Sequence, residues 1–319
     1  MRGLLLVNTG SPASSYRRDV RAFVETMLSD PLVMTVPDWI RPILVKGIIG
    51  PFRQFSSAKK YDLIWDKKHN QSPLMYAALQ LAELVEARAE IPVEVGMTYL
   101  EPSISYAMAK LMERNKGITE IIVLPLFPHY AESSYLTAVQ KVKEVYNDGK
   151  YNVQLRIVEP YFAHEDYILA LAESLKPYLK EDYDHLIFNF HSLPLDHVEK
   201  GFEQGKEFDY VFQVKETIRL LSVELDLDPK SVRVAFSSAF GKKWLEPSLN
   251  SQVEEMAKSG EKKVIVMSPG FAADNLETLY DIDILARSIF MKYGGEGFTY
   301  VPCLNYEQYW VDAIQQIIL

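Results

Sequence analysis

Short apolar runs alternate along the chain with longer segments in which apolar residues recur every three or four positions. The short runs lie at 3–8, 92–97, 119–126, 152–158, 185–190, 231–236, 262–268 and 298–302. The helical patterns include 74–90, 103–116, 132–147, 164–179, 208–225, 247–259, 274–291 and 305–318. Near-continuous apolar runs are typical of parallel strands that are covered on both faces. The alternation therefore predicts an α/β protein built on doubly wound parallel sheets.

Two parts of the chain repeat the same order of motifs. Residues 99–104 (YLEPSI) match 244–249 (WLEPSL), and each copy precedes a helical pattern and then a strand. Upstream, 4–12 corresponds to 186–194, so Thr9 occupies the place of His191. We interpret the repeat as two similar Rossmann-like halves, 1–150 and 151–319, that meet across a cleft. The alternative is that ordinary strand–turn–helix patterns produced these matches.

The first half is longer than the second, and its extra residues fall at about 31–70. This lip segment (31–70) combines apolar residues such as Trp39, Ile43 and Phe52 with basic ones such as Lys46 and Arg53. An apolar and basic insertion in an acidic protein suggests a cleft lip that contacts an apolar ligand or, through 31–60, a membrane surface. An ordinary helical hairpin packed on the core is the alternative.

Composition narrows the function classes. The 319 residues carry a net charge of −9, which argues against a nucleic-acid partner. Cys303 is the one cysteine, so no disulfide can form within the chain and an iron–sulfur cluster cannot be ligated. The N-terminus lacks a signal-peptide pattern and no apolar run is long enough to span a membrane, so a cytoplasmic location is expected. Dinucleotide, Walker and nucleophile-elbow glycine motifs are missing.

His191 stands where a buried strand ends and a turn begins, in 186–194 (LIFNFHSLP). Ligand sites of open α/β sheets lie just beyond the carboxyl ends of the strands. An imidazole there can accept a proton near neutral pH or bind a metal. The alternative is a hydrogen-bonded histidine with a structural role. His129, which follows the strand at 119–126, is a second candidate with the same alternative.

Carboxylates follow the strand at 262–268. Asp274, Glu277 and Asp281 are spaced i, i+3, i+7, which predicts one acidic face on an α-helix. Like charges on one face repel one another unless a cation lies among them. Helix capping is the alternative explanation for the first two. A histidine facing carboxylates, without a clustered second histidine or cysteine, suits a metal that is handed on, such as Fe²⁺, Co²⁺ or Zn²⁺.

Aromatic residues gather at the same strand-end turns. For each one alone, packing in the core is the simpler explanation. Together they could line a pocket for a flat apolar ligand. The residues are Tyr99, Phe127, Tyr130, Phe190, Trp244 and Phe271.

These motifs resemble those of the ferrochelatases, enzymes that insert Fe²⁺ into a porphyrin. The resemblance covers nearly the whole chain, and its most specific parts are 190–194 (FHSLP) and 271–279 (FAADNLETL). Further matches are 8–12 (NTGSP), 71–74 (QSPL), 98–99 (TY), 127–130 (FPHY) and 241–245 (GKKWL). The resemblance implies that this chain is a lyase of haem biosynthesis whose substrates are a porphyrin and Fe²⁺ and which has no resident cofactor. It also implies a monomer or homodimer, located in the cytoplasm or peripherally on the inner membrane.

The resemblance also implies residue roles. His191 and Glu277 would be the catalytic and metal-contacting pair, and Asp281 would continue an acidic path for iron. Substrate contacts would fall at Thr9, Ser72, Tyr99, Tyr130, Trp244 and Asn275.

The chain departs from many members at three of its matched positions. Thr9 stands where a coproporphyrin III branch has Tyr, which favours protoporphyrin IX as substrate. Thr98 replaces a frequent Arg, and Asn275 stands where some members have His. Coproporphyrin III as the substrate, a cobalt or nickel chelatase, and a tetrapyrrole-binding protein without catalysis are the alternatives.

Overall fold

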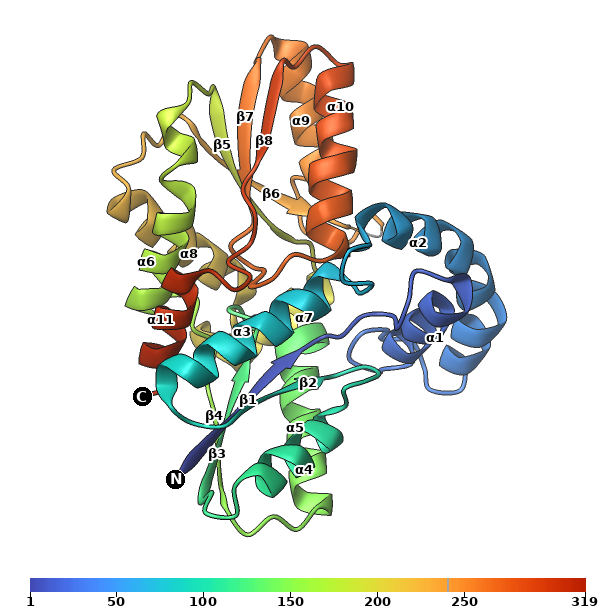
Figure 1. Ribbon diagram of the computed structural model, residues 1–319. Helices are drawn as coiled ribbons and strands as arrows, with labels where there is room; N and C mark the ends of the chain where they lie inside the picture. The colour runs from blue at the N-terminus through green and yellow to red at the C-terminus, as the bar shows by residue number, and fades with distance from the viewer. Residues whose placement is uncertain (240) are drawn as a thin grey trace. The chain divides into compact units, whose positions relative to one another are not determined.

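The computed structural model describes residues 1–239 and 241–319, which form two compact units (Figure 1). The first unit comprises Met1–Phe127, Glu132–Glu159 and Ile318, and the second comprises Pro128–Ala131, Pro160–Ile317 and Leu319. The chain thus passes between units after Glu159 rather than after residue 150, because the strand at 154–157 pairs within the first sheet.

The first unit is built on a parallel sheet of order β2-β1-β3-β4. Its strands are β1 (Arg2–Asn8), β2 (Val93–Met97), β3 (Glu120–Pro125) and β4 (Gln154–Ile157). Helices α4 (Ile104–Arg114) and α5 (Thr137–Asp148) pack on the face that bears Leu5 and Val123, and the short π-helix η2 (Glu132–Leu136) precedes α5. Helix α3 (Pro73–Ala89) covers the other face (Figure 1).

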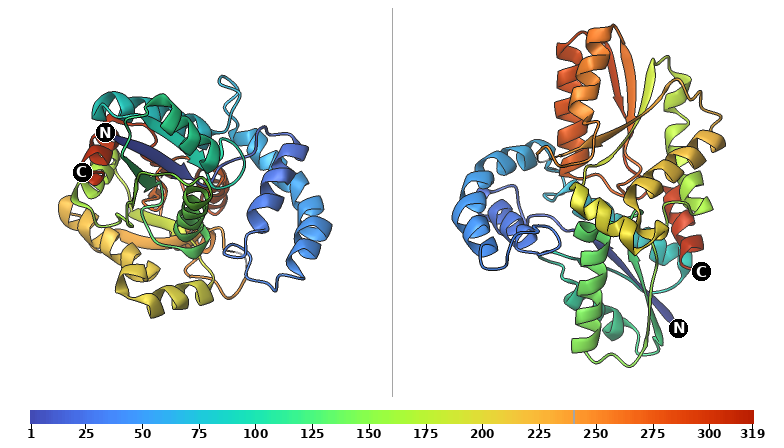
Figure 2. Two further views of the ribbon diagram at one scale, coloured as in Figure 1. Left: turned by 90° about the horizontal axis from the view of Figure 1, so that it is seen from below. Right: turned by 180° about the vertical axis from the view of Figure 1, so that it is seen from behind.

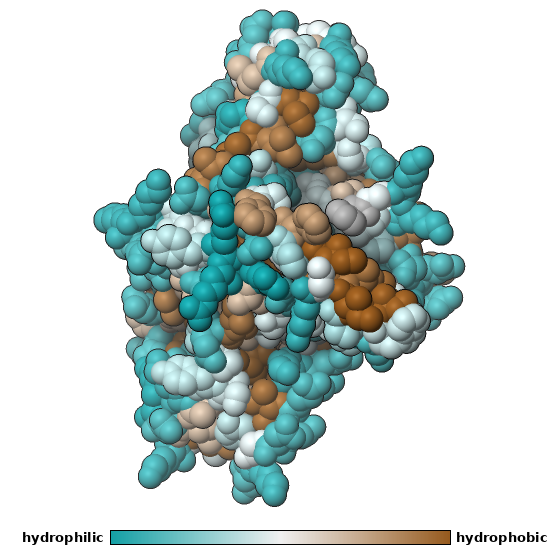
Figure 3. Space-filling view, turned by 90° about the vertical axis from the view of Figure 1, so that its right-hand side faces the viewer, coloured by the Kyte–Doolittle hydropathy of each residue, from teal (hydrophilic) through white to brown (hydrophobic). Residues whose placement is uncertain are grey.

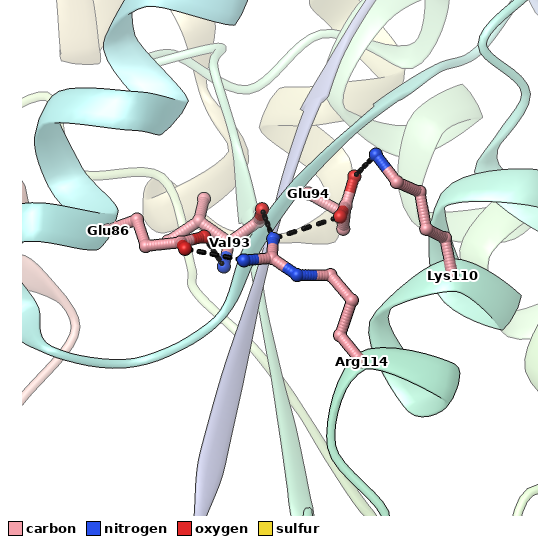
Figure 4. A network of polar contacts seen from close by, with 5 residues as sticks. All are labelled: Glu86, Val93, Glu94, Lys110 and Arg114. Carbon is pink, nitrogen blue, oxygen red and sulfur yellow. Dashed lines mark hydrogen bonds and ion pairs between the residues drawn. The ribbon is translucent and has the colours of Figure 1, made fainter.

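Strand β2 is an edge strand, and side chains cap its free edge (Figure 4). The Val93 N–H donates to Glu86 Oε2 at 2.9 Å, and the Arg114 Nη1 donates to the Val93 carbonyl at 3.0 Å. Arg114 and Lys110 also contact the buried Glu94, each at 3.0 Å. These charges occupy the edge at which another strand would otherwise add.

The lip segment is helical and packs against α1 (Arg17–Leu28). It contains the π-helix η1 (Ile43–Ile49) and α2 (Gly50–Ile64), joined without a break. Tyr61 packs edge-on against Phe23 of α1, and Val45 is fully buried. Apolar side chains nevertheless stay on its surface. Trp39 is 73% exposed and Phe52 is 76% exposed. The segment is therefore not a hairpin of its own: it holds one continuous helical stretch that packs on α1, with large apolar side chains left exposed.

The second unit repeats the architecture of the first. Its parallel sheet has the order β6-β5-β7-β8, formed by β5 (His185–His191), β6 (Val232–Ser237), β7 (Lys263–Met267) and β8 (Gly297–Tyr300). On one face lie α9 (Leu249–Ser259), the π-helix η5 (Glu277–Ala286) and α10 (Arg287–Lys292). On the other lie α6 (Glu165–Leu175), α8 (Tyr210–Glu224) and α11 (Gln308–Ile317), as Figure 2 shows from behind.

Shorter helices complete the second unit. Helix α7 (Leu195–Gln204) follows the turn after β5, and 3-10 turns occur at η3 (Tyr178–Lys180) and η4 (Lys206–Phe208).

The two repeated motifs adopt the same local structure. The Met97 N–H donates to the Pro102 carbonyl at 2.7 Å, and the Phe236 N–H donates to the Pro247 carbonyl at 2.9 Å. The following serines, Ser103 and Ser248, then cap α4 and α9 by accepting a backbone N–H. The matching strand orders and caps confirm that the chain contains two similar doubly wound halves.

Candidate active site

His191 is the last residue of β5 and pairs with Ser237 of β6. Its Nδ1 lies at hydrogen-bond distance from the Ser192 carbonyl, which can only accept. Nδ1 therefore carries the proton in the neutral ring, and Nε2 holds the lone pair. The His191 carbonyl accepts from the Tyr210 hydroxyl of α8 at 2.9 Å. The strand end, Ser192 and Tyr210 together fix the imidazole so that Nε2 is its basic atom.

Burial lowers the pKa of His191, because the charged imidazolium is poorly solvated there. The hydrogen bond to Ser192 and the charge of Asp281 act in the opposite direction, with smaller effects. Phe271 contributes to the apolar surroundings, with its ring centroid 6.4 Å from that of the imidazole. His191 is therefore held as a neutral base near neutral pH.

The acidic segment differs from the predicted α-helix. Residues 277–286 form a π-helix, in which hydrogen bonds run from i to i+5 and a turn takes more than four residues. Residues four apart, such as Glu277 and Asp281, consequently lie nearly above one another on η5. Asp274 precedes the helix, so the i, i+3, i+7 pattern does not place all three carboxylates on one face, and that expectation was wrong.

Asp274 has a structural role. One of its carboxylate oxygens accepts from Thr278 at 3.2 Å, from the Tyr300 hydroxyl at 2.5 Å and from the Cys303 N–H at 3.3 Å. The other oxygen accepts from Asn305 at 2.8 Å. A buried carboxylate with four donors is satisfied without a metal. Among the residues that the structure describes, no group of three or more His, Cys, Asp or Glu side chains could hold a metal ion.

The three candidate substrate residues of the first unit lie near its strand ends. Thr9 is half-buried, and its carbonyl accepts from the Tyr99 N–H at 3.0 Å. Ser72 is buried, caps α3 and donates to Ser11 Oγ at 2.6 Å. The buried Tyr99 donates its hydroxyl to Asp30 at 3.0 Å. Ser72 and Ser11 line a pocket of about 450 Å³, together with Trp65, Gln71 and Met75.

The candidates of the second unit are distributed differently. Tyr130 is buried, with its hydroxyl 3.4 Å from Gln204. Trp244 is half-buried in a loop that pairs with the turn after His191 through a bridge to Pro194. Asn275 uses its side chain to bond Thr278 and the Ala273 carbonyl, which fixes the start of η5.

The sequence did not single out two residues that contact the site. Tyr210 supports His191 from α8, and Ser238 donates to Asp281 Oδ2 at 2.7 Å. Tyr210 gave no sequence signal, since a tyrosine at a helix start is unremarkable in any amphipathic pattern. The pair of serines at the end of β6 was a signal, because polar residues at a strand's carboxyl end lie where ligand sites form.

The fold is that of the chelatases. A solved structure described as SirB from Bacillus subtilis with Fe³⁺ matches 77% of this chain and 90% of its own length, with a TM-score of 0.55 and 16% identity. DR2241 from Deinococcus radiodurans, a multi-domain protein described as structurally similar to chelatases, matches all of this chain and 55% of its own, with a TM-score of 0.52 and 11% identity.

The sequence comparisons are more specific. The family model for ferrochelatase matches residues 1–319. The ferrochelatase of Porphyromonas gingivalis is 35% identical, over 99% of this chain and 95% of its own length. The ferrochelatase of Pseudomonas putida is 34% identical, over 98% of this chain and 96% of its own length. The chain belongs to the ferrochelatase family. The family's reaction, insertion of Fe²⁺ into a porphyrin during haem biosynthesis, is therefore the reaction of this chain.

Proposed function

We propose that the chain inserts Fe²⁺ into protoporphyrin IX, with His191 as the acceptor of the pyrrole protons. The observation that carries this proposal is the hydrogen bond from His191 Nδ1 to the Ser192 carbonyl, which leaves Nε2 as a basic atom at a strand end. Thr9, in place of the tyrosine of the coproporphyrin III branch, supports protoporphyrin IX as the substrate.

The reaction needs a base and a bent ring. Two pyrrole N–H protons must leave before the metal can bind four nitrogens, and a flat macrocycle hides their lone pairs. Bending the ring costs about 1–5 kcal/mol, supplied by contacts remote from the reacting nitrogens. A positioned general base accelerates such a step by about 10²–10⁴-fold. In this proposal Glu277 stabilises the incoming metal or the imidazolium, and Asp281 lies on the path of the metal.

A metal-insertion assay tests the substrate and the base together. Fe²⁺, or Zn²⁺ as its spectroscopic substitute, is supplied with protoporphyrin IX and separately with coproporphyrin III. We expect the higher kcat/KM for protoporphyrin IX. His191→Ala should lose about 10²-fold or more in kcat. The control is His164→Ala, which removes a half-exposed imidazole at the start of α6 and should leave kcat unchanged.

Other outcomes point to the alternatives. A higher kcat/KM for coproporphyrin III would reverse the substrate proposal, and near-normal turnover of His191→Ala would refute the role of the base. Tight porphyrin binding without insertion of any metal would indicate a tetrapyrrole-binding protein. If Asp281 lies on the path of the metal, Asp281→Ala should raise the KM for iron more than the KM for porphyrin. Equal effects on the two KM values would contradict this role.

We also propose that the lip segment makes peripheral contact with a membrane. No helix in residues 1–239 and 241–319 has the length and apolarity to cross a bilayer. Figure 3 shows an apolar patch bordered by hydrophilic side chains on the face that the lip segment presents. Exposed aromatic side chains beside lysine and arginine suit the surface of anionic lipids.

Sedimentation with vesicles tests this contact. The double variant Trp39→Ser/Phe52→Ser should bind phosphatidylserine-containing vesicles more weakly than the original chain. The control is Phe202→Ser on α7, which removes an aromatic side chain that is 67% exposed. Equal binding by all three proteins would contradict the proposal. We further propose that the chain works in the cytoplasm without a resident cofactor, as a monomer or homodimer, which analytical ultracentrifugation distinguishes.

A further inference from the structure

Ser237 is the last residue of β6 and Ser238 follows it, and the two side chains bond in different directions. The Ser237 hydroxyl oxygen accepts from the Asn189 amide at 3.0 Å, which joins β6 to β5. The Ser238 hydroxyl donates to Asp281 Oδ2 at 2.7 Å, which joins the end of the strand to η5. Only the second bond reaches the acidic residues of the candidate active site.

The backbone at Ser238 takes a conformation that serves this bond. Its φ of +63° lies in the left-handed region, which residues other than glycine rarely adopt. Ala235 belongs to the same buried cluster as Ile282 and Ala286 of η5, and β6 contacts η5, so the side of β6 that bears Ala235 and Ser237 faces the π-helix. Side chains alternate along an extended strand, so an extended Ser238 would face away from η5. The left-handed turn returns its hydroxyl to Asp281.

Unfavourable backbone conformations persist where the surroundings enforce them, and they gather at functional sites. The bond to Asp281 gives a reason for this one. Asp281 is the carboxylate whose charge acts on the His191 imidazole. The direction in which that carboxylate points therefore matters for a metal passing between η5 and His191.

We propose that Ser238 is a positioning residue, which holds the Asp281 carboxylate in the orientation that delivers the metal to His191. This inference rests on the proposed function, because it assigns Asp281 to the path of the metal. Ser238 does not touch the reacting atoms in this scheme. Its removal should affect the metal side of the reaction and leave the porphyrin side unchanged.

The decisive variants are Ser238→Ala and Ser238→Gly. Both lack the hydroxyl, but alanine keeps the Cβ that serine already carries at this positive φ, whereas glycine removes it. If the hydroxyl is what matters, both should raise the KM for Fe²⁺ by about tenfold, the loss expected for a hydrogen bond to a charged group. The KM for porphyrin should stay unchanged. Ser237→Ala, which removes the neighbouring hydroxyl and its bond to Asn189, is the matched control and should keep the KM for Fe²⁺.

A double-mutant cycle separates positioning from a general structural effect. In an Asp281→Ala background, Ser238→Ala should cause no further rise in the KM for Fe²⁺, because the carboxylate that it orients is gone. The inference is overturned if the two effects multiply, if Ser238→Gly behaves like the original chain, or if the KM values for iron and porphyrin rise together.

Binding of Co²⁺ alone, measured by titration calorimetry on the full chain without porphyrin, gives a readout that needs no turnover. Ser238→Ala and Asp281→Ala should each weaken Co²⁺ binding, and the double variant should bind as Asp281→Ala does. If the original chain binds Co²⁺ in this way but inserts no metal, the inference stands and the proposed function fails. If it inserts metal but Ser238→Ala binds Co²⁺ normally, the inference fails alone.

Discussion

The buried His129 should make the second unit less stable in acid. Its Nε2 lies 2.9 Å from Thr217 Oγ1, and the Thr217 hydroxyl itself donates to the carbonyls of Phe162 and Gln213. Nε2 must therefore be the donor, and Nδ1 has no hydrogen-bond partner among the described residues. Phe190 packs against the ring at a centroid distance of 5.3 Å. Burial lowers the pKa of His129 from 6.5 to about 3.

The sign and size of the effect follow from this pKa. As the pH falls below 6.5, the unfolded chain binds a proton at His129 that the folded chain excludes until about pH 3. Unfolding is therefore favoured progressively across that window. Each pH unit contributes about 1.4 kcal/mol, so the loss between pH 7.5 and pH 5 is about 2 kcal/mol.

Native-state hydrogen exchange at the slowest amides of β5 measures this loss in the second unit alone. His129→Gln removes the titration and keeps an N–H that can reach Thr217. It should therefore show about 2 kcal/mol less destabilisation at pH 5 than the original chain. Thr217→Val is the matched control, since it removes the hydrogen bond but keeps the imidazole. It should be less stable at both pH values and keep the acid sensitivity. An equal acid loss in His129→Gln and the original chain would refute the reasoning.

Three further predictions concern the edge strand, a turn and the base. Arg114→Ala should cost about 1–3 kcal/mol in the free energy of unfolding, because the Val93 carbonyl and Glu94 each lose a donor; chemical denaturation measures this, and a change below 0.5 kcal/mol would contradict it. Gly10→Ala should destabilise the first unit by more than about 1 kcal/mol, since φ is +103° there and a Cβ would clash with the Tyr99 carbonyl, so an unchanged melting temperature would count against it. Because burial lowers the pKa of His191, the acid limb of kcat/KM should inflect below pH 6.5, and an inflection above 6.5 would show that the ring is not held neutral.

The sequence predicted the fold well because its strands are buried on both faces. The central residues of β1, β3, β5 and β7 are buried and mostly apolar, and such runs are hard to mistake in an α/β protein. The repeated motif indicated the second sheet. The apolar pattern could not show which strands pair with one another. In the sequence β4 looks like the first strand of the second half, and only its pairing with β3 assigns it to the first sheet.

The acidic segment shows where sequence reasoning ended. Apolar spacing cannot distinguish an α-helix from a π-helix over ten residues, so the faces of η5 could not be placed. Asp274 and Asp281 look alike in the sequence. Asp274, however, accepts hydrogen bonds from the loop at 300–305, whereas Asp281 accepts one from Ser238. That difference depends on contacts between distant segments, which no local pattern encodes. The catalytic, metal and substrate roles assigned to individual residues remain predictions that the experiments above can decide.

The hydrogen-bonded group around Asp274 provides the chain with an internal reporter. Cys303, the one cysteine, is buried there with its backbone N–H on the Asp274 carboxylate, and burial raises the pKa of its thiol. A protonated, enclosed thiol reacts slowly with alkylating reagents. The rate at which iodoacetamide labels Cys303 therefore measures how often the hydrogen-bonded group around Asp274, just before η5, opens. One mass-spectrometric time course, run with and without porphyrin or metal, would show whether substrates rigidify this region, and it requires no engineered label.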